Sequence, residues 1–386
     1  MASASPLKSI ALLYFDAGGG HRAAARALAQ AIALQERPWA TRLVNLQEVL
    51  LPIDIFRRAF GINLQDLYNQ LLFRGYTLGA GGMLKLLHGL IRLTHRGQLH
   101  CLEAYWRAQP ADLIVSLVPN FNRAIHQSVR RALPGTPSVT LLTDLADYPP
   151  HFWIEPETPA VICGTPHAAE QAAAAGLRPD QIHTVSGMLL DPRLYATAAA
   201  GDNRAALRSS LGLRPDLTTA LVLFGGMGSS RMLEIAQRLA QSRLPLQLIL
   251  VCGHNQRQEQ RVRQFAQSSS LPMRVEGYSH EIPRLMAAAD FMIGKPGPGS
   301  VSEALHSRLP LIVERNAWTL PQERYNADWI RENELGLVLR SFEALVPAVH
   351  QLLAPGALER FRRRAAAIQN RAVWEIPVIL DRLLNP

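Results

Sequence analysis

Residues 291–313 have the sequence FMIGKPGPGSVSEALHSRLPLIV. Short apolar runs at its two ends, 291–294 and 311–313, predict two buried strands, and the segment 300–306 between them predicts a helix. The Pro- and Gly-rich turn after the first run predicts a rigid bend between strand and helix. A strand, a crossover helix and a second strand together predict a parallel β-sheet covered by helices.

The same alternation continues on both sides of this stretch. In the second half of the chain, further strands are predicted at 218–224, 246–252 and near 274–276, and helices at 230–242, 256–268 and 281–289. In the first half, strands are predicted at 9–15, 112–118, 138–143, 160–163 and 182–186, and helices at 21–35, 121–133 and 166–175. The alternation of strands and helices is interrupted near residues 192–204. We therefore expect an α/β protein with two doubly wound, Rossmann-like domains, 1–198 and 199–369, that face each other across a cleft. A last helix within 370–386 is expected to pack back on the first domain.

The composition excludes several classes of protein. The chain has 386 residues, 48% hydrophobic and 18% charged, so it has apolar material for two cores and is not intrinsically disordered. Its three cysteines, Cys101, Cys163 and Cys252, lie far apart, which excludes a disulfide scaffold or a CxxC zinc site and favours a reducing, cytoplasmic setting. No uncharged apolar run is long enough to predict a transmembrane helix, and the run at 10–15 is too short for a secretory signal.

The charge of the chain points to an anionic partner. The formal net charge is +9, which suits a phosphorylated substrate or an acidic membrane surface. The arginines are dispersed over the predicted helices and are not interleaved with aromatic residues, so we expect no nucleic acid partner.

Residues 51–107 interrupt the alternation. Apolar side chains recur through this segment, and its arginines and lysines outnumber its acidic residues. A basic amphipathic helix of this kind can lie in the interface of an anionic membrane. The alternative is that its apolar faces pack on the N-terminal sheet while the arginines cover the edge.

The first candidate site has the sequence DAGGGH at 16–21, after a predicted strand and at the start of a helix. Gly19 and Gly20 leave backbone amides of the helix start open, and the helix dipole there favours an anion. The imidazole of His21 can take a proton from a hydroxyl near neutral pH. The alternative role of His21 is only to cap and pack the helix.

A second glycine-rich turn has the sequence FGGMGSS at 224–230, again between a strand and a helix. Amides near Gly225 and Gly226 could cradle a phosphate. Many strand-to-helix turns carry glycine for packing reasons alone, so this turn is a weak signal by itself.

The turn at 294–304 is a more specific signal. Backbone amides near Gly297, Gly299 and Ser300, at the start of a helix, can hold a diphosphate. Glu303 lies one turn further on, where its carboxylate can accept two hydrogen bonds from a ribose. The alternative for Glu303 is a capping box with Ser300.

The sequence PQERYN at 321–326 places three polar side chains at another helix start. Gln322, Glu323 and Asn326 lie within one turn of each other and could bind sugar hydroxyls. The alternative is an acidic N-terminal turn on a solvated helix.

These motifs resemble a known family in their order and separation. They are similar to the GT-B glycosyltransferases of the monogalactosyldiacylglycerol synthase and diacylglycerol glucosyltransferase family, which is related to the peptidoglycan GlcNAc-transferase MurG. Shorter stretches that share the resemblance are TDL at 143–145, VCGHN at 251–255 and EGY at 276–278. The resemblance runs from residue 9 to about residue 340.

The resemblance implies an inverting enzyme that moves a hexosyl group from a UDP-sugar to a lipid hydroxyl, with diacylglycerol as the expected acceptor. It implies a peripheral enzyme on the cytoplasmic face of the cell membrane that needs no metal and no cofactor. By carry-over, His21 is the base, Glu303 binds the ribose, and Gln322 and Glu323 bind the sugar. The implied donor-binding residues are Gly225, Gly226, His254, Asn255, Tyr278, Gly297, Gly299, Ser300, Glu303, Gln322, Glu323 and Asn326. The implied acceptor-side residues are Gly19, Gly20, Asp144, His151 and Trp153.

Departures from the family pattern lie at 118–119, 144–153 and 187–192, all in the acceptor-side half, so they leave the lipid open. The sequence also leaves open which sugar is transferred and how many are added. The alternative function is a soluble UDP-sugar enzyme of the same fold, either a transferase with a non-lipid acceptor or an enzyme like UDP-GlcNAc 2-epimerase.

Overall fold

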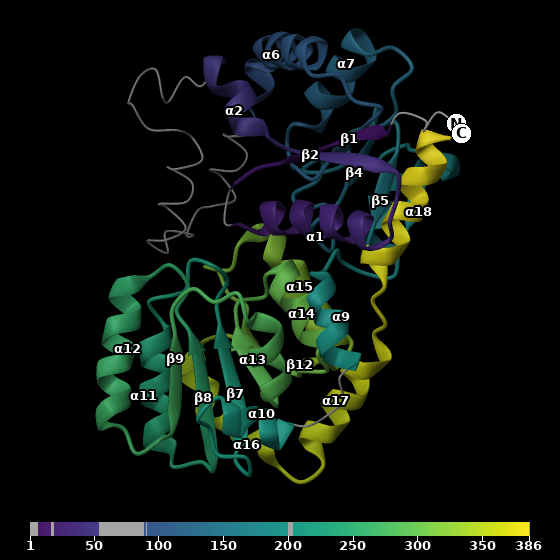
Figure 1. Ribbon diagram of the computed structural model, residues 1–386. Coiled ribbons are helices and arrows are strands. Elements are labelled where there is room, and N and C mark those ends of the chain that lie inside the picture. Colours follow the sequence, from purple (N-terminus) through teal and green to yellow (C-terminus); the bar gives the residue numbers. More distant parts are fainter. Residues whose placement is uncertain (1–6, 17–18, 54–88, 90, 200–203, 386) are drawn as a thin grey trace, which may run out of the picture. The chain divides into compact units, whose positions relative to one another are not determined.

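The computed structural model describes residues 7–16, 19–53, 89, 91–199 and 204–385, and the chain divides into two compact units (Figure 1). The first unit is Met1–Pro192 with Asn370–Pro386, and the second is Arg193–Gln369. Each unit is built on its own six-stranded sheet in which every pair of neighbouring strands is parallel. The predicted α/β architecture of two doubly wound domains is confirmed.

The boundary between the units lies earlier than the predicted 198/199. Helix α9 (Pro192–Ala199) belongs almost wholly to the second unit, and the side chains of Arg193 and Tyr195 contact that unit. Arg193 donates a hydrogen bond to the carbonyl of His280 at 3.1 Å, and the Tyr195 ring lies 4.3 Å from the His306 ring.

The sheet of the first unit has the order β2-β1-β3-β4-β5-β6. Its strands are β1 (Lys8–Tyr14), β2 (Trp39–Asn45), β3 (Leu113–Ser116), β4 (Ser138–Leu141), β5 (Val161–Cys163) and β6 (Ile182–Thr184). The chain moves outward in opposite directions from β1 and β3, so the switch point of this sheet lies between them. Ligands bind outside the carboxyl ends of the strands at such a point.

Helices cover both faces of this sheet. They are α1 (Gly20–Leu34), α2 (Leu46–Leu50), α6 (His95–Ala108), α7 (Asn122–Ala132), α8 (Pro166–Ala174) and α18 (Ala372–Leu384), with 3₁₀ turns at Leu51–Ile53 and Pro179–Gln181. In Figure 1, α18 crosses the C-terminal end of α1, and Arg37, just after α1, pairs with Asp381 of α18 at 3.0 Å. The terminal helix is therefore part of the first unit's packing.

Helix α6 shows what part of the basic segment 51–107 does. Leu99 is buried, Leu102 and Trp106 pack in one core with the sheet and α7, and the Trp106 indole donates to the Ser128 hydroxyl at 3.0 Å. For this helix the packing alternative is therefore correct. Residues 54–88 and 90, on which the predicted membrane-docking face mainly falls, lie outside the described residues.

The sheet of the second unit has the order β12-β11-β10-β7-β8-β9. Its strands are β7 (Thr218–Leu223), β8 (Leu246–Val251), β9 (Met273–Glu276), β10 (Phe291–Gly294), β11 (Leu311–Glu314) and β12 (Gly336–Leu339). The helices are α10 (Arg204–Ser210), α11 (Met232–Ser242), α12 (Gln256–Ser268), α13 (Ile282–Ala288), α14 (Pro298–His306), α15 (Pro321–Glu332), α16 (Leu345–Leu353) and α17 (Ala357–Ala367), with a 3₁₀ turn at Phe342–Ala344. The core on one face packs side chains of β7, β8 and β10 against α11, α12 and α16. The switch point lies between β7 and β10.

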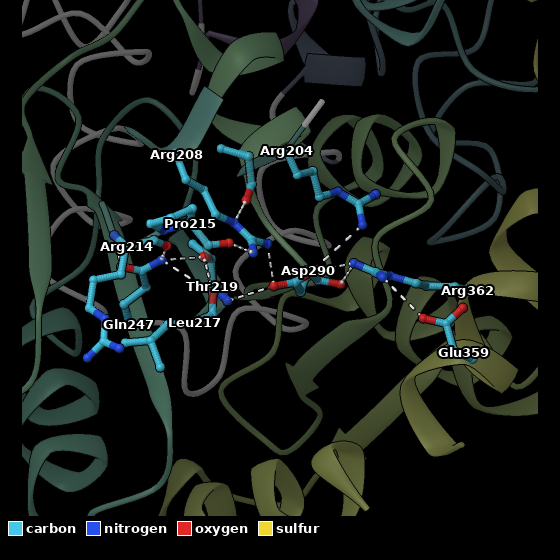
Figure 2. A network of polar contacts seen from close by, with 11 residues as sticks. Arg204, Arg208, Arg214, Pro215, Leu217, Thr219, Gln247, Asp290, Glu359 and Arg362 are labelled. Carbon is cyan, nitrogen blue, oxygen red and sulfur yellow. Dashed lines mark hydrogen bonds and ion pairs between the residues drawn. The ribbon is translucent and has the colours of Figure 1, made fainter. Parts of the chain in front are cut away.

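A charged network fastens the amino-terminal edge of this sheet (Figure 2). The carboxylate of Asp290, just before β10, accepts hydrogen bonds from Arg208 at 2.5 Å, Arg362 at 2.6 Å and the amide of Thr219 at 2.7 Å. Arg204 lies 3.7 Å away. The network joins α10 and α17 to the sheet at the edge opposite the loops that carry the candidate site.

Within the described part of the chain, no helix combines the length and the apolar character needed to cross a bilayer.

Candidate functional site

The loop from β1 into α1 opens a helix N-terminus at the switch point of the first sheet. Gly19, the N-cap of α1, has φ 81°, in the left-handed region that favours glycine. A Cβ placed on Gly19 or Gly20 would have no heavy atom within 4 Å, so the helix start is open on this side. Arg22 pairs with Asp16 across the loop at 2.8 Å. The first-turn amides have no partner within the helix, and their contact with an anion or a polar ligand stays a prediction.

His21 is held in the first turn of α1 by two neighbours. Its Nδ1 lies 2.8 Å from the Thr143 hydroxyl, and its ring lies 5.6 Å from the ring of Trp153. Burial among these groups lowers the pKa of His21 to about 4, because desolvation disfavours the charged imidazolium. The imidazole is therefore neutral near pH 7 and able to accept a proton. When Nδ1–H donates to Thr143, Nε2 carries the lone pair that accepts it.

The turn after β4 holds Trp153 next to His21. The buried Trp153 donates its indole N–H to the Asp144 carboxylate at 2.8 Å, so two predicted acceptor-side residues meet here. The backbone amides of Trp153 and His151 donate to Asp147 at 2.6 and 3.0 Å. Burial is the main cause that raises the pKa of Asp147. The His151 ring bonds the carbonyl of Ile154 at 3.2 Å and so helps to hold the turn.

Asp147 was not predicted as a site residue. Its importance comes from closing the turn that positions Trp153 beside His21. The spacing Asp144-x-x-Asp147 is the signal that could have found it, because two acidic residues one turn apart after a buried strand can organise a loop from within.

In the second unit, the loops after β7 and β8 touch each other through their backbones. The amide of His254 donates to the carbonyl of Gly226 at 2.8 Å. A Cβ on Gly253 would collide with that same carbonyl oxygen, so only glycine fits there. Gly225 and Gly253 have φ 80° and 61°, which also favours glycine. The loops after β7 and β8 therefore pack backbone against backbone at the carboxyl edge of the sheet.

An aromatic cluster lies beside these two loops. The rings of His254 and Tyr278 stack at 4.0 Å with an interplanar angle of 13°, and His280 packs edge-on to Tyr278 at 5.1 Å. Tyr278 is 48% exposed, so it offers a surface on which a base could stack. Asn255 caps α12 by accepting a bond from the amide of Gln258 at 3.0 Å, and its predicted contact with a nucleotide stays a prediction.

Helix α14 begins two residues before the predicted start. Its N-cap is Gly297 and its first residue is Pro298, so Ser300 lies in the first turn. The capping-box alternative for Glu303 is therefore wrong, because Ser300 is not the cap residue and Glu303 lies further into the helix. Pro298 has no N–H, and the first-turn amides of Gly299 and Ser300 have no partner within the helix. A Cβ on Gly299 would meet nothing within 4 Å, so no described side chain or backbone packs against this side of the helix start.

Three predicted residues at the start of α15 have different surroundings. Asn326 is fully buried and donates from Nδ2 to the carbonyl of Pro296 at 2.8 Å. This bond joins α15 to the turn before α14, whereas Oδ1 of Asn326 is buried without a hydrogen-bond partner, so its predicted sugar contact stays a prediction. Glu323 is buried and accepts a bond from Lys295 at 2.7 Å, which excludes a solvated acidic cap. Oε1 of Gln322 is buried and has no hydrogen-bond partner. A sugar hydroxyl would satisfy that oxygen.

Lys295 is the second residue that sequence reasoning missed. Two features of the sequence could have pointed to it. It lies inside the turn predicted to hold the diphosphate, and it is one of only three lysines in the chain. Among the described residues, no cluster of three or more histidine, cysteine, aspartate or glutamate side chains is placed to hold a metal ion.

Comparison with known proteins finds similarity to glycosyltransferases. Residues 220–373 match the model of the glycosyltransferase family 28 C-terminal domain. The chain is 29% identical over 352 residues to a probable monogalactosyldiacylglycerol synthase 2, chloroplastic, from Oryza sativa subsp. japonica, covering 86% of this chain and 70% of that protein. The resemblance predicted from the motifs is confirmed.

Solved structures with the same architecture include MurG from Acinetobacter baumannii, at TM-score 0.59 and 14% identity over 97% of this chain and 98% of that one. Another is the UDP-GlcNAc 2-epimerase from Neisseria meningitidis bound to UDP-GlcNAc, at TM-score 0.62 and 11% identity over 98% and 100%. These likenesses confirm the predicted GT-B fold. The fold alone does not separate a transferase from an epimerase.

Proposed function

We propose that this protein is an inverting enzyme that transfers a hexosyl group from a UDP-sugar to a lipid hydroxyl. The match to the glycosyltransferase family 28 C-terminal domain and the GT-B fold support this proposal. Diacylglycerol is the proposed acceptor and a glycolipid the product. The similarity to a monogalactosyldiacylglycerol synthase over 86% of the chain supports this choice of acceptor class over other acceptors.

The structural observation that carries the proposal is the neutral His21 at the open start of α1. A base that deprotonates an alcohol must have a free lone pair at the working pH, and burial, which lowers the pKa of His21, keeps its imidazole uncharged there. Thr143 fixes the ring through Nδ1 and leaves Nε2 for the acceptor hydroxyl. In this proposal the acceptor oxygen attacks C1 of the sugar, the C1–O bond to the diphosphate breaks, and His21 takes the hydroxyl proton.

The second unit supplies groups suited to the donor. Tyr278 and His254 offer an aromatic surface for uracil, and the amides of Gly299 and Ser300 lie at a helix start that favours the diphosphate. The buried Oε1 of Gln322 is an acceptor for a sugar hydroxyl. Amides and helix dipoles of this kind can stabilise the charge that develops on the leaving group. The proposed reaction therefore needs neither a metal ion nor a cofactor.

The lipid acceptor implies attachment to a membrane. Within the basic, apolar-rich segment 51–107, the part that precedes α6 has the sequence that supports docking on an anionic surface, and the proposed location is the inner face of the cell membrane. Flotation with vesicles tests this part. Binding to vesicles that contain phosphatidylglycerol, weakened by high salt, is the expected result, and recovery of all protein at the bottom of the gradient would contradict it.

A second candidate function is a UDP-sugar enzyme that does not use a lipid, including a 2-epimerase. The observation in its favour is the structural likeness to a UDP-GlcNAc 2-epimerase. A UDP-release assay separates the two, run with each UDP-hexose in turn and with diacylglycerol vesicles or plain vesicles. The proposed transferase releases UDP at a rate that rises with the diacylglycerol fraction. Release that ignores diacylglycerol, or a new UDP-sugar formed without acceptor, would refute the lipid transferase.

A further inference from the structure

Lys295 lies at the switch point of the second sheet. It is the first residue after β10, which pairs with β7. A Cβ on Gly225, in the loop after β7, would stand 3.6 Å from Cε of Lys295, and one on Gly297 would stand 3.4 Å from it. The lysine side chain thus runs between two glycines whose missing side chains leave it room. This is the position where doubly wound sheets bind their ligands.

The amino group of Lys295 is held in place by a buried carboxylate. Its Nζ donates to Oε1 of Glu323 at 2.7 Å, and Glu323 is buried whereas the Lys295 side chain is 41% exposed. The ion pair joins the turn before α14 to the first turn of α15. A buried acceptor fixes the direction of a flexible side chain, so the cation is pre-organised and still accessible.

The start of α14 adds to the positive potential beside this lysine. Gly297 is the N-cap of α14, and a Cβ on it would stand 3.7 Å from Nζ of Lys295. The amides of Gly299 and Ser300 follow in the first turn, where the helix dipole is positive. An ammonium and a helix N-terminus together favour a ligand with more than one negative charge. A diphosphate has that charge.

We propose that the Lys295 ammonium binds the diphosphate of the UDP-sugar and stabilises it as the leaving group, with Glu323 as the residue that positions Lys295. The inference rests on the proposed function, because it assigns a role within the same donor site. In the transfer, the bond between sugar C1 and the β-phosphate oxygen breaks and its electron pair stays on UDP. The acceptor oxygen forms the new bond to C1 and its proton goes to His21. Lys295 offsets the charge that UDP gains, the task that a divalent cation performs in metal-dependent transferases.

A purely structural ion pair is the competing explanation. It would make Lys295 and Glu323 matter for the stability of the second unit and would have no selective effect on phosphate binding. Ligands that differ only in their phosphates therefore separate the two roles.

The first experiment measures binding of UDP, UMP and uridine by titration calorimetry, without added metal. In Lys295→Met, the affinity for UDP should fall by about 10- to 100-fold, the effect of losing a charged hydrogen-bond donor, while the affinity for uridine changes by less than about twofold. Lys295→Arg should recover part of the UDP affinity. Lys8→Met is the matched control, because Lys8 pairs with Asp112 in the first unit and should leave all three affinities unchanged. Equal UDP affinity in wild type and Lys295→Met would overturn the inference.

The second experiment uses the wild-type protein and does not depend on a folded variant. The chain has only three lysines, Lys8, Lys85 and Lys295, so acylation by acetic anhydride can be followed at each by mass spectrometry. UDP should slow acylation of Lys295 by at least about fivefold and leave Lys8 unchanged, and uridine should protect neither. Unchanged acylation of Lys295 at saturating UDP would overturn the inference while the proposed function stands. Failure of the wild-type protein to bind UDP at all would refute the proposed function and the inference with it.

Discussion

The pH dependence of catalysis should report the unusual environment of His21. An imidazole in water titrates near 6.5, but burial beside Thr143 and Trp153 lowers the pKa of His21 to about 4. That difference corresponds to about 3 kcal/mol between the two protonation states. For the free enzyme, kcat/KM follows the pKa of the essential base. We therefore predict a kcat/KM that is flat from pH 8 to pH 6 and falls only as the pH approaches about 4.

The assay is initial-rate transfer from a UDP-hexose to an uncharged diacylglycerol, because the donor diphosphate stays ionised throughout this range. His21→Ala should lower kcat by about 10²- to 10⁴-fold, the usual contribution of a general base, and leave UDP affinity within about twofold of wild type. An acidic limb centred near pH 6.5, or a His21→Ala variant with nearly normal kcat, would refute the assignment.

Acid also weakens the folded state, so the assay needs a stability control. The folded pKa of His21 is below its unfolded value, so the unfolded chain binds more protons as the pH falls from 6.5 to about 4. Stability is fully present above pH 6.5 and is lost progressively through that window. His126, buried between Ser138 and Thr140 with a pKa lowered to about 3, adds a loss of the same sign that extends to lower pH. Circular dichroism at each pH shows whether a fall in rate precedes unfolding.

Three substitutions test contacts within the two units, and a chelator tests the metal independence of the proposed reaction. Asp290→Ala should lower the free energy of unfolding by about 3–5 kcal/mol in urea titrations, because it leaves Arg208 buried and unpaired, whereas Asp216→Asn in an exposed pair should change it by less than about 0.5 kcal/mol; equal effects would contradict the network in Figure 2. Thr143→Val should lower kcat about tenfold with little change in KM, since it removes the partner that orients the imidazole, and an unchanged kcat would count against that role. Tyr278→Ala should weaken UDP and uridine binding alike by about 10-fold in calorimetry, and an effect confined to UDP would argue against base stacking. A metal chelator in the transfer assay should leave the rate unchanged, and a loss that Mg²⁺ restores would refute metal independence.

The central strands of both sheets could be predicted because they are continuous apolar runs, buried on both faces. Of the edge strands of the two described sheets, β6 and β9 were predicted, whereas β2 and β12 were missed. β2 (Trp39–Asn45) mixes exposed Ala40 and partly exposed Arg42 with buried residues, and β12 is a short Gly-Leu-Val-Leu segment. β2 and β12 each have one neighbouring strand and partial exposure, and their sequences lack the apolar run that marks a central strand.

The residues at the carboxyl edges could be placed from motifs, but their individual roles could not. Asn326 looks like a ligand-binding amide in the sequence, yet it is fully buried and its Nδ2 donates to the carbonyl of Pro296, while its Oδ1 has no partner. Lys295 and Glu323 are 28 residues apart, and only the folded sheet brings β10 and α15 together so that they pair. Local pattern predicts which residues reach the edge of the sheet. Long-range packing decides which of them stay accessible there.

The configuration of the product tests the central claim most directly. The purified protein is incubated with an α-linked UDP-hexose and diacylglycerol vesicles, and the anomeric proton of the lipid product is examined by NMR. The account predicts a hexosyl diacylglycerol with the β-configuration, which follows from a single displacement assisted by His21. An α-linked glycolipid, or conversion of the UDP-sugar with no sugar attached to the lipid, would contradict it.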